Sequence, residues 1–253
     1  MKLLKPEVAG QYRKLCRSEY EIKQSGKIMK VPRVPLNEEP INGAATVEKY
    51  DRYAALFIRP EYTYTVNKIL KHKINSGLVL DIGTGSGRLA IGLAKAFPDM
   101  SVVGLDISLD MLKQARVNTG KQKGARDIDY VRATAAQLPF PDQSMDIVTS
   151  YASLHHWRQP VGVFNEIWRV TKENGLILIR DNRRFLGNPF YAAGLRLISL
   201  PMNRQQRKMW PKSILASYTV EEVKQILAQS AIENYRVHTD MGGFDLIIEA
   251  RKR

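Results

Sequence analysis

The feature that most constrains the fold is a glycine-rich turn between an apolar run and a helical pattern. Residues 78–82 are almost all apolar, as expected for a strand that is buried on both faces of a parallel sheet. Residues 88–97 carry apolar side chains three and four positions apart, and this pattern stops before Pro98. Between the two segments lie Gly83, Gly85 and Gly87. Glycine allows positive φ and the close approach of a ligand to the free N–H groups of a helix N-terminus, so the sequence predicts a ligand-binding turn.

Two acidic residues narrow the choice of ligand. Asp81 stands two residues before the first glycine, where a pyrophosphate site would gain nothing from a negative charge. The G-x-G-x-G spacing also differs from the G-x-G-x-x-G of dinucleotide-binding folds. Asp106 ends the next apolar run about 20 residues after Gly85, the position at which a carboxylate binds ribose hydroxyls. The pattern therefore favours a cationic ligand that carries a ribose.

The acid, the glycines and the second acid together resemble the class I S-adenosylmethionine-dependent methyltransferases. Three further stretches resemble the type 11 branch of that family, typified by ubiquinone and menaquinone biosynthesis. They are residues 50–54 (Y-D-x-x-A in the branch), residues 133–142 (G-D-A-x-x-L-P-F-x-D) and residues 154–156 (L-H-H). The resemblance covers roughly residues 46–181 and 219–250. It implies a methyltransferase that uses S-adenosyl-L-methionine.

The resemblance also implies which residues hold this cofactor. They are Tyr50, Asp81, Gly83, Thr84, Gly85, Asp106, Ile107, Met111, Thr134, Ala135 and Ser150. Thr134 stands where relatives carry an acid that accepts a bond from the adenine amino group, and Ala133 replaces a glycine. A threonine hydroxyl accepts such a bond without charge assistance, so we expect weaker cofactor binding than in the family. For Tyr50 the alternative is a tyrosine pair with Tyr53 on the inner face of an amphipathic helix.

Methyl transfer from a sulfonium depends mainly on holding the nucleophile and the methyl group in line, so few residues need to take part in the chemistry. If a general base is used, the candidates are Tyr151, His155 and Asp181, in no fixed order. His155 and His156 are adjacent; metal ligands on one helix face are three or four residues apart, and neighbours point apart. We therefore predict no metal site.

The resemblance implies a Rossmann-like, doubly wound α/β fold. Its sheet has seven mostly parallel strands in the order 3-2-1-4-5-7-6, and the last strand is antiparallel. Local patterns predict that Thr46 and Ser108 are the N-cap residues of two helices. A further helix is expected over about residues 61–73. The helix after Ser108 is expected to end near Gly120.

Two later helices are also marked by local signals. A helix is expected from Pro160 to Thr171, with Asn174 and Gly175 as the signal that ends it. Thr219 and Glu222 have the spacing of a capping box.

Length and composition favour a single methyltransferase domain. Of the 253 residues, 44% are hydrophobic and 25% charged, which is ordinary for a globular protein. The expected parts are an N-terminal arm and cap helix (1–60), the core (61–181 and 219–253) and an insertion after strand five (182–218). The one cysteine, Cys16, excludes an internal disulfide. Because no signal peptide or long apolar run is visible, we expect a cytoplasmic protein.

The net charge of +14 is concentrated outside the expected core. Residues 1–36 contain nine cations and three acids, and residues 182–212 contain seven cations, including Arg183 and Arg184, and no acid. We expect the two segments to form a basic lid over an acidic acceptor; a solvated surface without a partner is the alternative. Such a lid would also suit RNA, or an anionic membrane surface contacted through Leu195, Leu197, Ile198 and Leu200.

The leading interpretation is methyl transfer to a small-molecule acceptor that is acidic or lipid-like. RNA methylation is the second, although the chain shows neither a tetrapeptide of the N-P-P-Y kind nor a catalytic cysteine pair. The third is a non-catalytic cofactor-binding module, because a fold alone does not fix a function.

Overall fold

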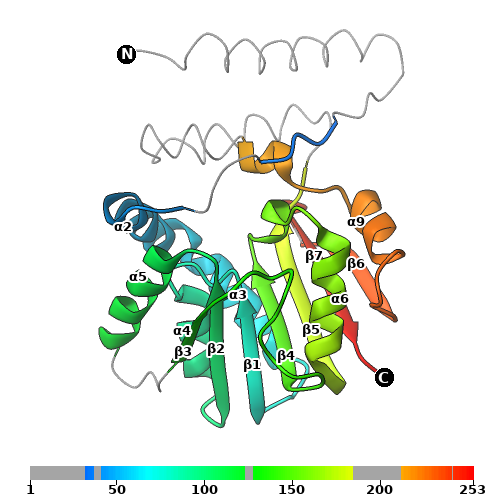
Figure 1. The fold of residues 1–253 in the computed structure, drawn as a ribbon, viewed down its shortest axis with the longest axis horizontal. Coiled ribbons are helices and arrows are strands. Elements are labelled where there is room, and N and C mark those ends of the chain that lie inside the picture. Colours follow the sequence, from blue (N-terminus) through cyan, green and yellow to red (C-terminus); the bar gives the residue numbers. More distant parts are fainter. Residues whose placement is uncertain (1–31, 37–40, 123–127, 185–211, 241) are drawn as a thin grey trace, which may run out of the picture.

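The computed structural model describes residues 32–36, 41–122, 128–184, 212–240 and 242–253, which form an open sheet with helices on both faces (Figure 1). The strands are β1 (Gly77–Ile82), β2 (Met100–Asp106), β3 (Ile128–Arg132), β4 (Met145–Tyr151), β5 (Thr171–Asn182), β6 (Tyr235–Thr239) and β7 (Asp245–Arg251). They lie in the order β3-β2-β1-β4-β5-β7-β6. Neighbours from β3 to β5 are parallel, and β7 is antiparallel to both β5 and β6. The predicted fold class and strand order are confirmed.

The named helices precede the sheet or connect its strands. They are α2 (Ala44–Tyr53), the π-helical η1 (Ala54–Ile58), α3 (Arg59–Leu70), α4 (Arg88–Ala96), α5 (Leu109–Gly120), the 3₁₀ turn η2 (Leu154–His156), α6 (Pro160–Val170) and α9 (Val220–Leu227). None of the described helices is long and apolar enough to cross a lipid bilayer.

The sheet separates two apolar layers because successive strand residues point to opposite faces. Leu80 and Ile177 pack with α6 and α9 on one face. Their chain neighbours Val79 and Leu178 pack with α3, α4 and α5 on the other. Strands covered on both faces need apolar residues at every position, which explains the continuous apolar run around residue 80.

The strand order reverses direction beside β1, whose neighbours are β2 and β4. The carboxyl ends of these parallel strands lie at the upper edge of the sheet in Figure 1, below α2. A reversal of this kind leaves a crevice at the carboxyl ends, where open α/β sheets bind ligands.

Two predicted helix caps are confirmed. The Ser108 hydroxyl accepts a hydrogen bond from the Met111 N–H at the start of α5, which ends at Gly120. Thr219 and Glu222 form a reciprocal capping box at the start of α9. Each cap satisfies N–H groups that have no partner within the helix.

The prediction that Thr46 caps the first helix is wrong. α2 begins at Ala44, and Gly43 occupies the N-cap position with φ 88°. The Gly43 N–H donates to Asp110 Oδ2 at 2.8 Å, so a contact with α5 fixes this start. The following helix also differs: α3 spans Arg59–Leu70, and η1 joins it to α2 without a break.

The predicted bounds of α6 agree with the structure to within one residue, but Asn174 and Gly175 do not cap the helix. The helix ends at Val170, and Thr171 is already paired with Met145 of β4. Asn174, with φ 62°, lies where the β4–β5 register shifts, and its N–H donates to Lys252 O at 2.8 Å. The turn residues therefore form a bulge inside β5.

Candidate functional site

The glycine turn after β1 is anchored to β2 and open on one side. The N–H groups of Gly83 and Thr84 donate to Leu105 O at 2.8 and 3.0 Å. Gly83, Gly85 and Gly87 have φ values of 71°, 54° and 78°. A Cβ on Gly83 would lie 2.3 Å from Ser153 Oγ, whereas a Cβ on Gly85 would meet no protein atom within 4 Å. The turn is thus packed behind Gly83 and open in front of Gly85.

The two predicted carboxylates flank this opening. Asp81 is 1% exposed and accepts a bond from Thr84 Oγ1 at 2.7 Å. Burial raises the pKa of Asp81 to about 7, although the Thr84 bond opposes the shift. Asp106 accepts the Gly85 N–H at 2.9 Å on one oxygen and the Ser108 N–H at 2.8 Å on the other. Burial raises the pKa of Asp106 as well, and these backbone bonds lower it.

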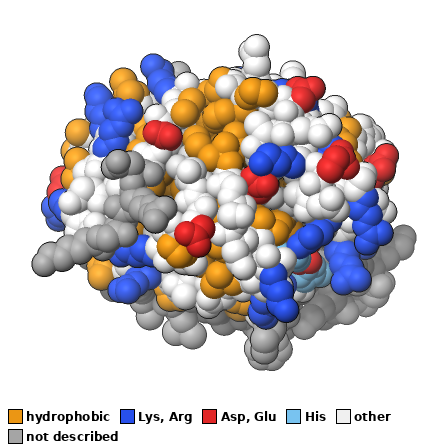
Figure 2. Space-filling view, turned by 90° about the horizontal axis from the view of Figure 1, so that it is seen from below, with side chains coloured by type: hydrophobic (Ala, Val, Ile, Leu, Met, Phe, Trp, Pro, Cys, Tyr) orange, Lys and Arg blue, Asp and Glu red, His pale blue; other side chains and the backbone are white. Residues whose placement is uncertain are grey.

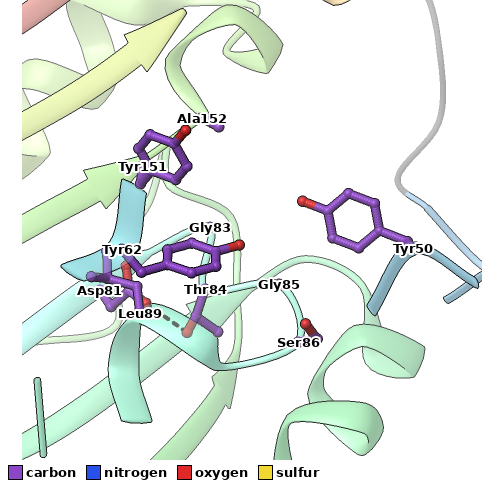
Figure 3. A pocket seen from close by; sticks show the side chains of 10 residues that line it. All are labelled: Tyr50, Tyr62, Asp81, Gly83, Thr84, Gly85, Ser86, Leu89, Tyr151 and Ala152. Atoms are coloured by element: carbon purple, nitrogen blue, oxygen red, sulfur yellow. Dashed lines mark hydrogen bonds between the residues drawn. The ribbon is translucent and has the colours of Figure 1, made fainter. Parts of the chain in front are cut away.

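A pocket opens between the glycine turn and the end of β4 (Figure 3). Six of the predicted site residues line it: Tyr50, Asp81, Gly83, Thr84, Gly85 and Tyr151. The sequence analysis missed four others: Tyr62, Ser86, Leu89 and Ala152. Ser86 and Leu89 lie within the motif region and could have been inferred from the turn. Tyr62 carries no local signal, because the residues that it meets lie far away in the sequence.

Three tyrosines from different elements meet in this pocket. The rings of Tyr62 and Tyr151 are 5.5 Å apart and nearly perpendicular. Burial raises the pKa of Tyr50 to about 12; the neighbouring Asp106 adds to the shift, and a hydrogen bond with Tyr62 opposes it. Burial also raises the pKa values of Tyr62 and Tyr151 well above 10. All three phenols are therefore neutral at physiological pH.

Asp51, next to Tyr50, fixes the cap helix over the pocket. Its two carboxylate oxygens accept bonds from Arg88 Nε and Nη2, both at 2.8 Å. Asn118 Nδ2 donates to Asp51 Oδ1 at 2.8 Å and to Ser86 O at 2.9 Å. Asp51 thus joins α2 to the start of α4 and to α5, a role that the sequence pattern did not reveal.

The remaining predicted cofactor residues do not line this pocket; Asp106 is among them and contacts its edge through the Gly85 N–H. Ile107 is 50% exposed, Met111 is buried, and Ala135 packs against the core. Thr134 is exposed, and its hydroxyl accepts the Ala136 N–H at 3.2 Å. Ser150 is fully buried and donates to Ile82 O at 2.7 Å, so its hydroxyl joins β4 to β1.

The structure pairs two of the three candidate bases. His155 Nδ1 lies 2.7 Å from Asp181 Oδ1, and the His155 N–H donates to Asp181 Oδ2 at 2.7 Å. Both side chains are almost fully buried, at 3% and 1% exposure. The expectation that His155 and His156 point apart is wrong, since their ring centroids are 4.2 Å apart. Tyr151 remains separate and belongs to the pocket wall.

The described end of the N-terminal arm lies beside this pair. Arg33 donates to His155 O at 3.1 Å and to Ala216 O at 2.6 Å, and its guanidinium lies 4.1 Å from the centre of the Tyr218 ring. The Val34 N–H donates to Leu215 O at 3.1 Å. Residues 32–36 therefore contact the last residues of the insertion.

Arg184 does not belong to the predicted basic lid. It is 4% exposed, donates to Ser217 O at 2.7 Å and pairs with Glu222 Oε1. Arg183 forms an isolated bridge with Tyr218, and its N–H donates to Phe244 O at 2.9 Å. The other insertion cations named for the lid, apart from Lys212, lie outside the described residues, as do the predicted membrane contacts Leu195, Leu197, Ile198 and Leu200.

Residues 80–179 match the protein family described as a methyltransferase domain. An uncharacterised methyltransferase of Schizosaccharomyces pombe is 30% identical over 118 residues, which cover 45% of this chain and 42% of the relative. A demethylmenaquinone methyltransferase of Roseiflexus castenholzii is 37% identical over 101 residues, covering 40% and 41%. The chain thus spans less than half the length of these two relatives.

Solved structures share the fold. A putative S-adenosyl-L-methionine-dependent methyltransferase of Methanococcus maripaludis has a TM-score of 0.68 at 24% identity, covering 86% of this chain and 98% of that one. Phosphoethanolamine N-methyltransferase 2 of Haemonchus contortus, in complex with S-adenosyl-L-methionine, has a TM-score of 0.61 at 17% identity, covering 83% and 57%. In its sheet order, its glycine turn with two acids and its methyltransferase-domain match over residues 80–179, the chain is similar to the class I, Rossmann-like, S-adenosylmethionine-dependent methyltransferases.

Proposed function

We propose that the chain transfers a methyl group from S-adenosyl-L-methionine to a small acceptor that is acidic or lipid-like. The observation that carries the proposal is the open cradle at Gly85, which lies between buried Asp81 and half-buried Asp106. A side chain at position 85 would occupy the space in front of the turn, so the backbone leaves room there for a ligand. A carboxylate on each side suits a ligand with ribose hydroxyls and a positive charge.

In this proposal the residues that would hold the cofactor lie at the carboxyl ends of β2, β1 and β4. Asp106 accepts the ribose hydroxyls, because each of its oxygens receives one described N–H and keeps further acceptor capacity. Asp81 and Thr84 face the cationic part. The residues after β2 and β3 surround the adenine; these are Ile107, Met111, Thr134 and Ala135. Ser150 supports the site by fixing β4 to β1.

When bound, S-adenosyl-L-methionine supplies a methyl group on a sulfonium. The residues around it mainly orient the reactants, an effect that can supply about 7–11 kcal/mol. His155 is the proposed proton acceptor. With Nδ1 donating to Asp181, Nε2 is the ring atom that can take the proton of the acceptor. Tyr151 is a poorer base, because a phenol with a strongly raised pKa ionises too rarely at neutral pH.

Two observations support the acceptor class. Relatives include demethylmenaquinone methyltransferases, which are named for a quinone acceptor. The basic residues of the arm and the insertion favour an acidic acceptor, and Arg33 of the arm contacts the backbone of His155. Both classes are small compared with an RNA chain.

Calorimetry with S-adenosyl-L-methionine tests the cofactor assignment. Loss of a charge-assisted ribose bond is worth about 1.5–3 kcal/mol, so Asp106→Ala should weaken binding roughly 10- to 150-fold. Asp129→Ala, which removes an exposed acid of the neighbouring strand β3, is the matched control and should bind normally. Wild-type protein that binds NAD but not S-adenosyl-L-methionine would refute the proposal.

Turnover variants test the proton acceptor. His155→Gln and Asp181→Asn should each lower kcat by about 10²- to 10⁴-fold while cofactor affinity stays unchanged. His156→Gln, which alters the exposed neighbour, is the control. Equal losses in all three variants would show that the pair has no special part in proton transfer.

A further inference from the structure

Hydrogen bonds and a ring contact hold Arg33 of the N-terminal arm in one orientation. Its Nε donates to Ala216 O at 2.6 Å and its Nη2 to His155 O at 3.1 Å, and its guanidinium lies 4.1 Å from the centre of the Tyr218 ring. Figure 1 shows residues 32–36 (blue) beside the described residues that lead into α9 (orange), above the upper edge of the sheet. Bonds along one edge and the contact with the ring fix both the position and the plane of the guanidinium.

The opposite edge of this guanidinium has no partner among the described residues. The bonds to Ala216 and His155 use Nε and Nη2, so that Nη1 and one N–H of Nη2 remain. No acid in the described ranges forms an ion pair with Arg33, whereas the buried Arg180 and Arg184 each pair with carboxylates. Arg33 is also partly exposed. Its remaining donors form a fixed planar fork, which suits two oxygen atoms of a carboxylate or a phosphate.

Arg33 lies beside the proposed proton acceptor and away from the residue proposed to hold the ribose. Arg33 binds the carbonyl of His155, which follows β4, and the partner of His155, Asp181, lies near the end of β5. Burial raises the pKa of Tyr218; the Arg33 charge lowers this pKa and the Asp181 charge raises it, so both charges lie near the ring. Asp106 ends β2, on the other side of β1. An anion at Arg33 would therefore lie beside the His155–Asp181 pair.

We propose that Arg33 binds the acid group of the methyl acceptor, a carboxylate or a phosphate, and thereby holds the acceptor beside His155. The proposal rests on the proposed function and deepens it, because it takes the acidic class over the lipid-like one and assigns the residue that recognises it. One edge of the guanidinium anchors the arm, and the other receives the acceptor. Since the anchoring bonds already orient the donors, little conformational entropy is lost when the acid binds.

Nuclear magnetic resonance tests this site with inorganic phosphate and benzoate as probes, with and without saturating S-adenosyl-L-homocysteine and at constant ionic strength. At least one of these anions should shift the Arg33 Nε–H signal of wild-type protein in a saturable way. Arg33→Gln should weaken binding, followed through the Ala216 and His155 backbone signals, by about tenfold, the lower end of the range for a hydrogen bond to a charged group. Arg33→Lys keeps the charge without the fork and should recover only part of this loss. Arg158→Gln removes an exposed cation near His155 in the sequence and should change affinity less than about twofold.

Methyl transfer shows whether the anion bound at Arg33 is the acceptor. Radiolabelled methyl groups from S-adenosyl-L-methionine should pass to acids in an extract of small metabolites, which anion exchange separates from neutral compounds. Arg33→Gln should lower this transfer by about tenfold or more while cofactor affinity stays unchanged, and Arg158→Gln should lower neither.

The outcomes separate this inference from the proposed function. If wild-type protein binds S-adenosyl-L-methionine but neither probe, or passes label to neutral compounds only, the acid subsite is refuted while the cofactor assignment stands. Probe binding that S-adenosyl-L-homocysteine abolishes, or weaker cofactor binding in Arg33→Gln, would assign Arg33 to the carboxylate of the cofactor and also refute the inference. If wild-type protein does not bind the cofactor, both proposals fail.

Discussion

Asp81 is a buried acid, and its negative charge lowers the stability of the folded protein. Its pKa is about 7 in the folded protein, against an ordinary value of 3.8, because burial disfavours the carboxylate. The folded state therefore binds a proton more tightly than the unfolded chain, and this residue adds stability as the pH falls from 7 towards 3.8. Without ligand, Asp81→Asn should melt at a higher temperature than wild type at pH 8 and show little gain at pH 5. Thermal melts at both pH values measure this; a destabilised variant at pH 8 would contradict it.

The same pKa predicts pH-dependent cofactor binding. A cation binds the ionised carboxylate, so protonation competes with the ligand. Affinity for S-adenosyl-L-methionine should fall as the pH drops below about 7, approaching tenfold per pH unit, and level off above it. Calorimetry between pH 5.5 and 8.5 checks the profile, and Asp81→Asn should bind weakly with a flat profile. A flat wild-type profile would show that the cation does not meet Asp81.

Candidate site residues could be predicted from the sequence where they belong to one short motif. The glycine turn, Asp81 and Asp106 belong to one strand-turn-helix-strand unit, so their spacing revealed them. Tyr62 could not be found in this way, because it meets Tyr151 through the tertiary packing of α3 against the sheet. The base candidates were named without order; only the structure shows that His155 and Asp181 are bonded and Tyr151 is not.

At the scale of elements, the position of α2 depends on Asp51. Its carboxylate holds the start of α4 through Arg88 and α5 through Asn118. Asp51→Ala should destabilise the protein by about 1.5–3 kcal/mol and weaken cofactor binding, because Tyr50 on the next position loses its support. Glu48→Ala removes the other acid of α2, whose pair with Arg52 is exposed, and should change stability by less than about 1 kcal/mol. Chemical denaturation measures the change in stability, and calorimetry measures cofactor binding. Equal effects of the two substitutions would contradict the role of Asp51 in holding α2 against α4 and α5.

Element boundaries were predictable where the signal is local. Ser108 and the Thr219–Glu222 box cap their own helices, so the residues that decide the start are adjacent. The start of α2 was missed because Gly43 donates to Asp110, which is 67 residues away. Asn174 and Gly175 lie inside β5 and not at a helix end, because Thr171 already pairs with β4. Tertiary contacts override local preference in both cases.

For the whole molecule, the salt dependence of turnover distinguishes a small acceptor from RNA. Figure 2 shows the face at the amino ends of the strands, where described basic and acidic side chains are interspersed among hydrophobic and neutral ones. We expect kcat/KM for the acceptor to change less than about tenfold between 50 and 200 mM salt, since few ions are displaced. RNA held by six to ten phosphate contacts would lose about 10³- to 10⁵-fold in affinity over this range. A collapse of turnover of that size would point to RNA.

The described residues just before position 185 contact those that lead into α9. Arg183 bridges to Tyr218, the Arg184 N–H donates to Tyr218 O at 3.0 Å, and the Arg184 side chain bonds Ser217 and Glu222. When the residues that flank a connecting segment are already in contact, the free-energy cost of closing the chain depends only weakly on the length of the segment. Replacing residues 187–209 by a short glycine-serine linker should therefore preserve folding and cofactor affinity, measured by melting and calorimetry, while turnover of the acceptor changes. Acceptor selectivity could then change through substitutions in this segment alone, while the residues that hold the cofactor stay the same.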